Sequence, residues 1–586
     1  MKLPSLIIIS LLLVITLQEK PKITKPTNSL NRPIFHFTPQ YGWMNDPNGL
    51  WHEIGEGENG EDIWHLYYQY NPNGTVWALP LYWGHATSKD LITWEHDEDV
   101  AVSPFNDESG AYSGSAVVDE DNTSGFFGAL NEAQLPKSKR VVAIWTFNAD
   151  DWIETQCISF SLDGGSKFKH YRMNPVIAMN SKQFRDPQVI RYENEHWVMS
   201  VAKSHQYKIQ FYTSTNLKNW KVAGAFSLYG YLGYQYECPN LAKMKYNGST
   251  APWSTSVQDN GYLWVLFISI NPGSLQGGSS TEYFIGNFDG NNFTPIRNYA
   301  APIDYGKDFY ALQIFFNSKD DSGNIYGIAW TSNWQYSGNV PTDNWRSSMS
   351  LVRRMTLDDF ESAPGTKIAF IKSEPVTSFN DGNLRYGKLY SIDSKDKNFK
   401  LNPFYPKHTI DISEQVNGAV EFKLTFDVKD GNWTKANPAH FYLDFKGYLI
   451  PDEYLRLGYE GEAGAFFVDR GHTNVDWVHD NPFFTDKLSV HIQPQSKSDD
   501  GSVKTYYVHG FIDRNIVELY FNDGYQVSTN TFFMTGGNWI GSVDLTLNKI
   551  DYDFTKNKYY EPFTFDFKVR QVLGTDGEKD KGFDTA

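Results

Sequence analysis

The sequence predicts an all-β protein, a β-propeller followed by a β-sandwich, from its strand-like segments, a loose internal repeat and a change of pattern near residue 361. Turn residues separate the strand signals, and long helical periodicity is absent. Aromatic residues make up 16% of the chain, and large rings suit half-buried strand faces. The strand signals are HLYYQY (65–70), VVAIWTF (141–147), HWVMSVA (196–202), IQFYTS (209–214), LWVLFISI (263–270), EYFIGNF (282–288) and NIVELYF (515–521).

Four segments share a pattern that is typical of propeller blades. Each follows an apolar strand, contains a turn and ends in an aromatic residue. They read SKDLITW (88–94), SLDGGSKF (161–168), STNLKNW (214–220) and NFDGNNF (287–293). A recurrence of a few tens of residues is expected for four-stranded sheets stacked around an axis. Ordinary β-hairpins give the same order, so both interpretations stay open on this signal alone.

Domain boundaries follow from shifts in composition. An apolar run after Lys2, at 3–17, is too short to span a bilayer comfortably and predicts a signal peptide. Loop-like residues mark the end of the repeat, and alternating strands beyond them suggest a sandwich. We place the signal peptide at about 1–20, the propeller at 30–373, a linker at 374–385, the sandwich at 386–572 and a polar, disordered tail at 573–586.

The charge balance excludes some partners. The chain has 52 Lys and Arg against 69 Asp and Glu, a formal net charge of −17. Nucleic acid is not expected as a partner, because its affinity comes largely from basic contacts to phosphate. Nothing after the leader reaches membrane-spanning length, so no membrane association is expected.

The leader and five N-x-S/T sequons predict a glycosylated, secreted protein of the extracellular or cell-wall space. The sequons are at Asn73, Asn122, Asn247, Asn292 and Asn432. The only two cysteines, Cys157 and Cys238, do not make a disulfide scaffold.

The sequence carries no motif that indicates a dinucleotide site, a metal site or a serine nucleophile. GEGENG at 55–60 matches the spacing of a dinucleotide fingerprint, but no helix pattern follows and its glutamates would repel a pyrophosphate, so we read it as a hairpin loop. There is no HExxH segment, no tight Cys/His cluster and no G-x-S-x-G elbow. Neither a metal site nor an organic cofactor is expected.

Three carboxylates stand in unusual settings. Asp46 lies in WMNDPNG (43–49), Asp186 in QFRDPQV (183–189) and Glu237 in GYQYECPNL (233–241). Asp-Pro-Asn-Gly and Asp-Pro are also ordinary turn sequences, and Glu237 could simply end a strand in water. Trp43 and Met44 beside Asp46 are, however, large for a surface turn, and Tyr234, Tyr236 and Cys238 give Glu237 the partly apolar setting of a general acid.

A propeller would bring these acids together. Its loops converge on the axial channel, so residues far apart in sequence can meet there. Hydrolysis of a glycoside needs two carboxyl groups beside the scissile bond, roughly 5 Å apart in a retaining enzyme. Arg185 could hold the carboxylate of Asp186 ionised or bind sugar hydroxyls.

Together, WMNDPNG, FRDP and YQYECP, in that order, resemble glycoside hydrolase family 32, particularly yeast invertases and exo-inulinases. The resemblance covers about Asn31 to Val572 and includes HLYYQYNP, PLYWGHATSKDL, GKDFYALQ, WRSSMSLVR, EYLRLGYE and VELYFNDG. It implies a five-bladed propeller followed by a β-sandwich. It also implies hydrolysis of terminal β-fructofuranosides in sucrose, and of inulin or levan, without metal or cofactor.

The resemblance implies a role for each matching residue. Asp46 resembles the nucleophile, Glu237 the acid/base and Asp186 the residue that stabilises the transition state. Cys238, next to Glu237, is expected to tune the pocket rather than form a disulfide. Sugar-binding positions are matched by Asn45, Gln69, Ser113, Arg185 and Trp334, with Trp43 and Trp77 lining the pocket.

The chain departs from the family pattern at a few positions. Tyr112 replaces a phenylalanine, Ala78 and Leu79 stand where Gly and Thr are usual, and Asn240 replaces Gly or Asp. We place all of them near the rim of the pocket, with Tyr112 able to reach the sugar or to face water.

Three other functions remain open. One is a fructosyltransferase that makes short fructo-oligosaccharides from sucrose. Another is a lectin-like protein without activity, against which the presence of all three acids argues. The third is an arabinan-cleaving propeller, against which WMNDPNG and ECP argue. Yeast relatives also suggest self-association through the sandwich.

Overall fold

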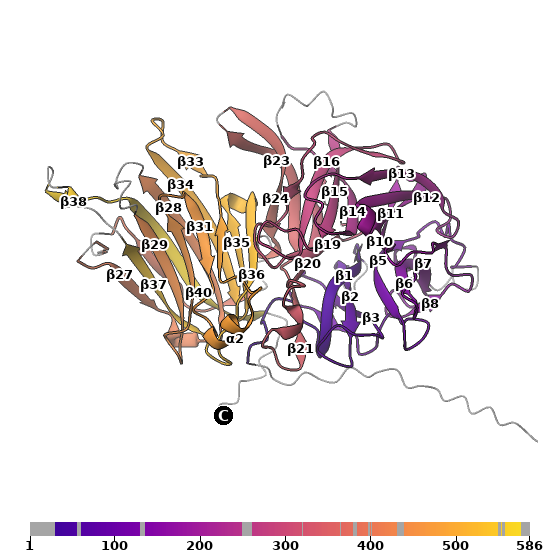
Figure 1. Ribbon diagram of the computed structural model, residues 1–586, viewed down its shortest axis with the longest axis horizontal. Helices are drawn as coiled ribbons and strands as arrows, with labels where there is room; N and C mark the ends of the chain where they lie inside the picture. The colour runs from indigo at the N-terminus through magenta and orange to yellow at the C-terminus, as the bar shows by residue number, and fades with distance from the viewer. Residues whose placement is uncertain are drawn as a thin grey trace, which may run out of the picture.

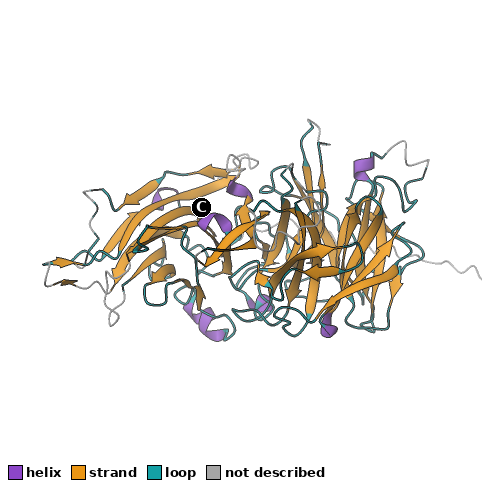
Figure 2. Ribbon diagram, turned by 90° about the horizontal axis from the view of Figure 1, so that it is seen from above, coloured by secondary structure: helices purple, strands orange, loops and turns teal. Residues whose placement is uncertain are grey.

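The computed structural model describes residues 30–55, 60–128, 135–248 and 261–575, apart from 319, 321, 364, 379–383, 397–398, 400, 403, 430–438, 549–551 and 554–556. The described chain forms two packed bodies of β-strands that lie side by side (Figure 1). Helices are few and short (Figure 2), and α2 spans only Val475–Asp480. This confirms the all-β prediction.

The N-terminal body contains five sheets, each an antiparallel path of four successive main strands. Their first strands contact one another in a closed circle, which is the arrangement of a propeller. The first two sheets are β1 (Gly42–Glu53), β2 (Ile63–Asn71), β3 (Tyr82–Ser88) and β4 (Glu95–His96), then β5 (Gly110–Val118), β6 (Val141–Asn148), β7 (Glu154–Ser161) and β8 (Phe168–His170) with β9 (Ile177–Ala178).

The other three sheets repeat this order, and one short strand links the last part of the propeller to its start. β21 (Trp345–Arg346) runs parallel to β1. The sheets are β10 (Arg185–Tyr192), β11 (His196–Lys203), β12 (Lys208–Ser214) and β13 (Lys221–Ser227); β14 (Tyr236–Lys245), β15 (Tyr262–Ile270), β16 (Ser280–Phe288) and β17 (Phe293–Pro295) with β18 (Ala301–Pro302); and β19 (Tyr310–Ile314), β20 (Ile325–Thr331), β23 (Arg353–Ala363) and β24 (Thr366–Pro375) with β22 (Ser348–Met349).

The repeat that we identify in the sequence occupies one place in each of four sheets, the turn between the third and fourth strands. Its fourth residue is left-handed every time, with φ of 65° at Leu91, 81° at Gly164, 61° at Leu217 and 88° at Gly290. In the first copy, the carboxylate of Asp90 accepts the N–H groups two and three residues later, which fixes the turn. The repeat is therefore a blade signature and not a chance series of hairpins.

A closed ring of hydrogen bonds joins the five first strands around the axis. In each, an amide or hydroxyl side chain accepts a backbone N–H from the next sheet. The acceptors and their donors are Asn48 with Gly114 (3.3 Å), Ser115 with Val189 (3.0 Å), Gln188 with Leu241 (3.1 Å), Asn240 with Ile314 (3.1 Å) and Gln313 with Leu50 (3.2 Å). We call these five acceptors the axial ring. The last pair returns to the first sheet and so closes the propeller.

The C-terminal body is a sandwich of two sheets. Side chains of alternating residues meet between the sheets in a Phe-rich core, for example Phe422 and Phe426 against Phe441 and Phe445. One sheet holds β25 (Leu384–Tyr386), β26 (Tyr390–Asp393), β28 (Ala419–Lys429), β33 (Ser496–Lys497), β34 (Val503–Asp513), β35 (Ile516–Phe521), β36 (Gln526–Thr531) and β40 (Phe563–Thr575). The other holds β27 (Lys407–Asp411), β29 (His440–Gly447), β30 (Tyr454–Glu460), β31 (Ala465–Asp469), β32 (Lys487–Val490) and β37 (Ile540–Asn548), and β38 (Tyr552–Asp553) pairs with β39 (Lys558–Tyr559).

The predicted boundaries differ from the strands in two places. The predicted linker, 374–385, includes the end of β24 and the start of β25, because these residues pair with the strands of the two bodies. The predicted tail, 573–586, begins within β40, since Thr575 still pairs with Leu384. The rest of that tail and the predicted signal peptide lie outside the described residues.

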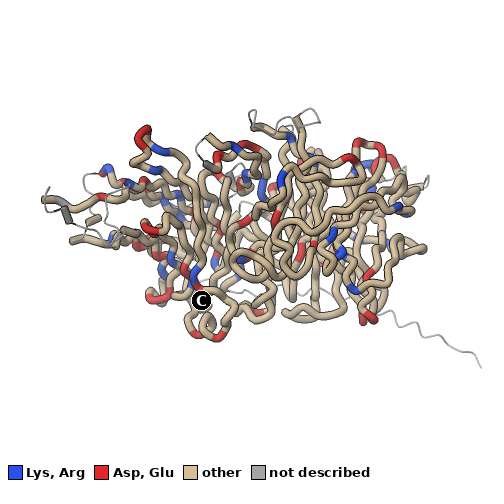
Figure 3. The backbone as a smooth tube through the Cα atoms, turned by 45° about the horizontal axis from the view of Figure 1, so that its top comes forward, with Lys and Arg blue, Asp and Glu red and all other residues tan. Residues whose placement is uncertain are grey.

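Buried ion pairs join the two bodies. Arg353 in the propeller lies 3.7 Å from Glu518 in the sandwich, and it also contacts Asp304 of its own body at 2.8 Å, to which the hydroxyl of Thr529 in the sandwich donates. Arg470 in the sandwich contacts Asp308 in the propeller at 2.9 Å. Both arginine side chains are fully buried. Elsewhere, Lys and Arg lie interspersed with Asp and Glu along both bodies (Figure 3).

Candidate active site

A β-bulge near the start of each first strand turns one side chain toward the axis. The pairing register shifts between Met44 and Pro47, Tyr112 and Gly114, Arg185 and Gln188, Glu237 and Asn240, and Tyr310 and Gln313. The unpaired residues include Asp46, Ser113, Asp186 and Cys238. Bulges commonly re-aim side chains next to active sites, and here φ is 62° at Asp186 and 45° at Cys238. The two Asp-Pro segments, for which an ordinary turn was the alternative interpretation, are thus bulges within strands.

Asp46, Ser113 and Asp186 line a cavity of about 480 Å³. The three predicted acids line it together, although they come from different sheets. The other predicted residues that line it are Asn45, Gln69, Trp77, Tyr112, Ser113, Arg185 and Trp334. The residues that sequence reasoning did not identify are Asn148, Trp152, Glu154, Lys182, Gln183, Gln235, Asn271 and Tyr310.

Among the predicted substrate-binding residues, Trp43 alone does not line the cavity, and Ala78 and Leu79, which we placed near its rim, do not line it either. The side chain of Trp43 is buried, and its Nε1 donates to Asn45 Oδ1 at 2.8 Å. It packs against the rings of Trp330 and Trp334. Trp43 therefore lies behind Asn45 and orients its amide instead of lining the cavity. Asn240 is likewise not at the rim, since it is buried in the axial ring.

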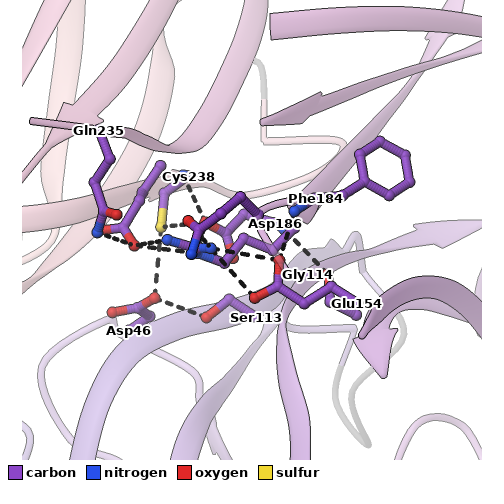
Figure 4. A network of polar contacts seen from close by, with 12 residues as sticks. Asp46, Ser113, Gly114, Glu154, Phe184, Asp186, Gln235 and Cys238 are labelled. Carbon is purple, nitrogen blue, oxygen red and sulfur yellow. Dashed lines mark hydrogen bonds and ion pairs between the residues drawn. The ribbon is translucent and has the colours of Figure 1, made fainter. Parts of the chain in front are cut away.

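Asp46 is held by three donors. Ser113 Oγ donates to its Oδ2 at 2.7 Å, and Cys238 Sγ lies 3.5 Å from the same oxygen (Figure 4). Asn45 Nδ2 donates to Oδ1 at 3.1 Å. Burial raises the pKa of Asp46, and these hydrogen bonds oppose that rise by stabilising the ionised form. The carboxylate is therefore fixed in one orientation while its basicity is kept.

Glu237 has a polar environment, contrary to our expectation of a partly apolar one. Its Oε1 accepts from Arg185 Nη2 at 2.8 Å, from Arg185 Nε at 3.1 Å and from Gln235 Nε2 at 3.0 Å. The hydroxyl of Tyr310 donates to Oε2. The neighbouring Tyr236 points into the core, and Tyr234 is 61% exposed. Hydrogen bonds rather than aromatic contacts thus hold this side chain.

Asp186 and Cys238 complete the centre of the cavity. The backbone N–H of Cys238 donates to Asp186 Oδ2 at 3.0 Å, and its Sγ lies 3.7 Å from the same oxygen (Figure 4). Burial raises the pKa of Asp186 to about 8, with Arg185 opposing the rise and Glu237 and Asp46 adding to it. Burial also raises the pKa of the Cys238 thiol well above its usual value, so it stays protonated. Cys157 and Cys238 are both free thiols.

Glu154 is a fourth acid that sequence reasoning missed. It begins β7, is 3% exposed and contacts Arg185 Nη1 at 3.2 Å. A signal was present, because period-two alternation puts Glu154 and Gln156 on the same face as the buried Ile158. Two polar residues on the buried face of a strand indicate a polar site.

The cavity therefore holds four carboxyl groups near one guanidinium. Like charges so close cannot all ionise near neutral pH, so protons remain bound within the site. This is the condition for a general acid to work beside an ionised carboxylate. Among the residues that the structure describes, no group of three or more His, Cys, Asp or Glu could hold a metal ion.

A five-sheet propeller with paired carboxyl groups at one mouth of its axis defines a glycosidase-type site. The model of the glycosyl hydrolases family 32 N-terminal domain matches residues 36–364, and the model of the family's C-terminal domain matches 388–553. The chain therefore belongs to glycosyl hydrolases family 32, and it is a glycoside hydrolase of the β-fructofuranosidase type.

Individual proteins of known activity are similar to this chain over most of its length. Invertase 1 of Saccharomyces cerevisiae is 47% identical over 546 residues, covering 92% of this chain and 95% of that protein. An extracellular exo-inulinase of Meyerozyma guilliermondii is 42% identical over 509 residues, covering 86% and 90%. A β-fructofuranosidase from Schwanniomyces occidentalis, solved with fructosyl-erythritol, has a TM-score of 0.80 at 38% identity and covers 94% of this chain and 99% of that one.

Proposed function

We propose that the protein is a retaining β-fructofuranosidase that releases the terminal non-reducing fructose of sucrose and of inulin. The observation that carries this is the placement of Asp46 and Glu237 on one cavity, each with its own set of donors and with Asp186 between them. Relatives named invertase and exo-inulinase support both substrates. Levan stays an untested prediction.

In the first step, Asp46 attacks the anomeric C2 of the fructosyl unit while Glu237 protonates the leaving oxygen. The bond between C2 and the leaving oxygen breaks as a bond from Asp46 to C2 forms. Ser113 and Asn45 hold the nucleophile's oxygens in place, which keeps the attack in line. Arg185 and Tyr310 fix Glu237 so that its proton is delivered in one direction.

In the second step, Glu237 takes a proton from water, whose oxygen attacks C2 and releases Asp46. Two displacements at C2 retain its configuration. Asp186 lies beside both acids and is placed to bind fructose hydroxyls while positive charge develops on the ring. Asn45, Gln69, Tyr112 and Trp334 line the same cavity and are proposed to hold the sugar, with Trp77 at its side.

Hydrolysis is favoured over transfer to a sugar acceptor. The relatives named above are an invertase, an exo-inulinase and a β-fructofuranosidase, and none is named a transferase. Trp77 and Trp152 stack with centroids 6.5 Å apart beside the cavity, which suits the part of the substrate beyond the cleaved bond.

Secretion and glycosylation are further parts of the proposal. An extracellular relative supports secretion. No helix among the described residues is long and apolar enough to cross a membrane. Asn73, Asn247 and Asn292 are exposed and suit glycan attachment, whereas the amide of Asn122 donates to Phe127 O at 3.0 Å. Asn432 lies outside the described residues, and self-association through the sandwich remains a prediction.

The test is sugar release from sucrose and from inulin by wild type, Asp46→Ala and Glu237→Ala. We expect equimolar glucose and fructose from sucrose, fructose from inulin, and a loss of several orders of magnitude in each variant, since each removes a reacting group. Circular dichroism controls for folding. A folded wild type that releases no sugar would contradict the proposal, and dominant kestoses at high sucrose would favour transfer.

A further inference from the structure

The strongest feature that the proposed reaction does not use is Glu154. Its carboxylate lines the cavity from β7, on the opposite side of Arg185 from Glu237. Its side chain is 4% exposed, and burying a carboxylate is costly unless it is paired. A glutamate kept in this place therefore acts on its partner.

The guanidinium of Arg185 lies between two carboxylates. Its Nη1 contacts Glu154 Oε1 at 3.2 Å and Oε2 at 3.4 Å, whereas Nη2 and Nε contact Glu237 Oε1 at 2.8 Å and 3.1 Å. Nη1 also donates to Gln183 Oε1 at 3.0 Å, and Nε lies 4.0 Å from Asp186 Oδ2. One rigid cation is thus shared by two acids.

Glu154 also holds the backbone in front of Arg185. The N–H of Phe184 donates to Glu154 Oε2 at 2.5 Å, and Gln156 Nε2 donates to Phe184 O at 2.7 Å (Figure 4). Both groups of one residue are therefore clamped by β7. A glutamine at 154 keeps an acceptor for this N–H while removing the charge.

We propose that Glu154 is a positioning residue that, through Arg185, sets the alkaline limit of catalysis. This rests on the proposed acid role of Glu237. An ionised Glu154 draws Arg185 toward itself and repels negative charge on Glu237, so Glu237 keeps its proton to higher pH. Without the charge on Glu154, Arg185 stabilises the ionised form of Glu237, and Glu237 then loses the proton needed for catalysis at a lower pH.

The charge of Glu154 changes within the pH range in which the enzyme is expected to act. Burial raises its pKa to about 7, opposed by Arg185 and by the Phe184 N–H, and Glu237 adds to the rise. The groups that face it are Arg185 from β10, Glu237 from β14 and Tyr112 from β5, while Lys182 and Gln183 line the same cavity.

The distance between the two carboxylates limits how far the charge of Glu154 can shift the titration of Glu237. Two carboxylates on opposite edges of one guanidinium stand roughly 6–7 Å apart, and at an effective dielectric constant of roughly 20 to 40 one charge shifts the titration of the other by roughly one to two pH units. Because Glu154 is only partly ionised near its pKa of about 7, Glu154→Gln should move the alkaline limb of the kcat/KM profile for sucrose down by less than this full shift, by about one pH unit at most.

The experiment measures kcat/KM between pH 4 and 9 for wild type, Glu154→Gln and Glu53→Gln. Glu53 is a matched control, a buried glutamate 3.0 Å from Lys139 at the far end of β1. We expect Glu154→Gln to lie within about threefold of wild type at pH 4.5 and to lose activity at lower pH than wild type. Glu53→Gln should leave the shape of the profile unchanged.

Two results would overturn the inference. One is an alkaline limb of Glu154→Gln that coincides with wild type, and the other is an equal loss at every pH, which would mean a structural role only. Glu154→Ala should lose activity at all pH values because it also frees the Phe184 N–H. An inactive wild type would instead refute the proposed function, so the two failures are distinguishable.

Discussion

Replacing His36 with glutamine should destabilise the protein at acidic and neutral pH and have little effect near pH 9.5. His36 lies in the N-terminal segment that packs on the sandwich, and its side chain is fully buried. Its Nδ1 lies 2.9 Å from Asp513 Oδ2 and its Nε2 lies 3.5 Å from Glu518 Oε1. A protonated imidazole is thus placed between two buried acids.

The magnitude follows from the pKa of His36. Burial alone would lower it, but hydrogen bonds and charge from Asp513 and Glu518 outweigh burial and raise the pKa from 6.5 to about 9. This difference corresponds to about 3 kcal/mol of stability. Because the folded-state value lies above the unfolded one, the stabilisation is fully present below about pH 6.5 and is lost as pH rises toward 9.

The assay is thermal and urea denaturation of wild type and His36→Gln from pH 5.5 to 9.5. At pH 6 the gap in unfolding free energy should be about 3 kcal/mol, or about 3 °C in Tm for a chain of this length. The gap should close by pH 9.5.

His65→Gln serves as the control. Burial lowers the pKa of His65 to about 4, below its unfolded value, so its gap should change in the opposite direction, narrowing as pH falls below about 6.5 and staying constant above about pH 7.5. A His36→Gln gap that is equally wide at pH 6 and pH 9.5 would refute the argument for a buried imidazolium.

Two further predictions concern the site and the ring. The rate of sucrose hydrolysis should be bell-shaped in pH, with its acid limb above the usual aspartate range, since Asp46 must be ionised and burial raises its pKa; a flat profile up to pH 8 would contradict these roles. Gln313→Leu should lower Tm by several degrees, because its side chain serves both Leu50 N–H and Gly114 C=O, and each buried group left unpaired costs about 1–3 kcal/mol. Calorimetry tests this, and an unchanged Tm would show that the ring adds nothing to stability.

The sequence was informative where local backbone chemistry determines the outcome. The Ser-x-Asp and Ser-x-Asn turns predicted blades because Asp90 and its counterparts fix a turn using only their own segment. The three acids could be identified because large or aromatic residues stand beside Asp46 and Glu237, and because WMNDPNG, FRDP and YQYECP resemble the motifs of one family. Their meeting at one cavity then followed from the propeller geometry.

Other features depend on contacts between distant segments. We expected Asn240 near the rim of the pocket, yet its amide oxygen accepts the N–H of Ile314 and so joins β14 to the neighbouring strand β19. The family resemblance placed Trp43 in the pocket, but its ring packs on Trp330 and Trp334, which are distant in sequence, and it bonds to Asn45 from behind. Glu154 was missed because its importance comes from Arg185, which is 31 residues later in the chain.

The axial ring also determines how material passes through the molecule. Its side chains are buried, and the cavity of about 620 Å³ beyond it shares no lining residue with the catalytic cavity. The axis is therefore a dead end and not a tunnel. A long polymer therefore cannot be threaded along the axis. The released monosaccharide must leave by the opening through which the next substrate enters, so product release and substrate binding compete for the same entrance.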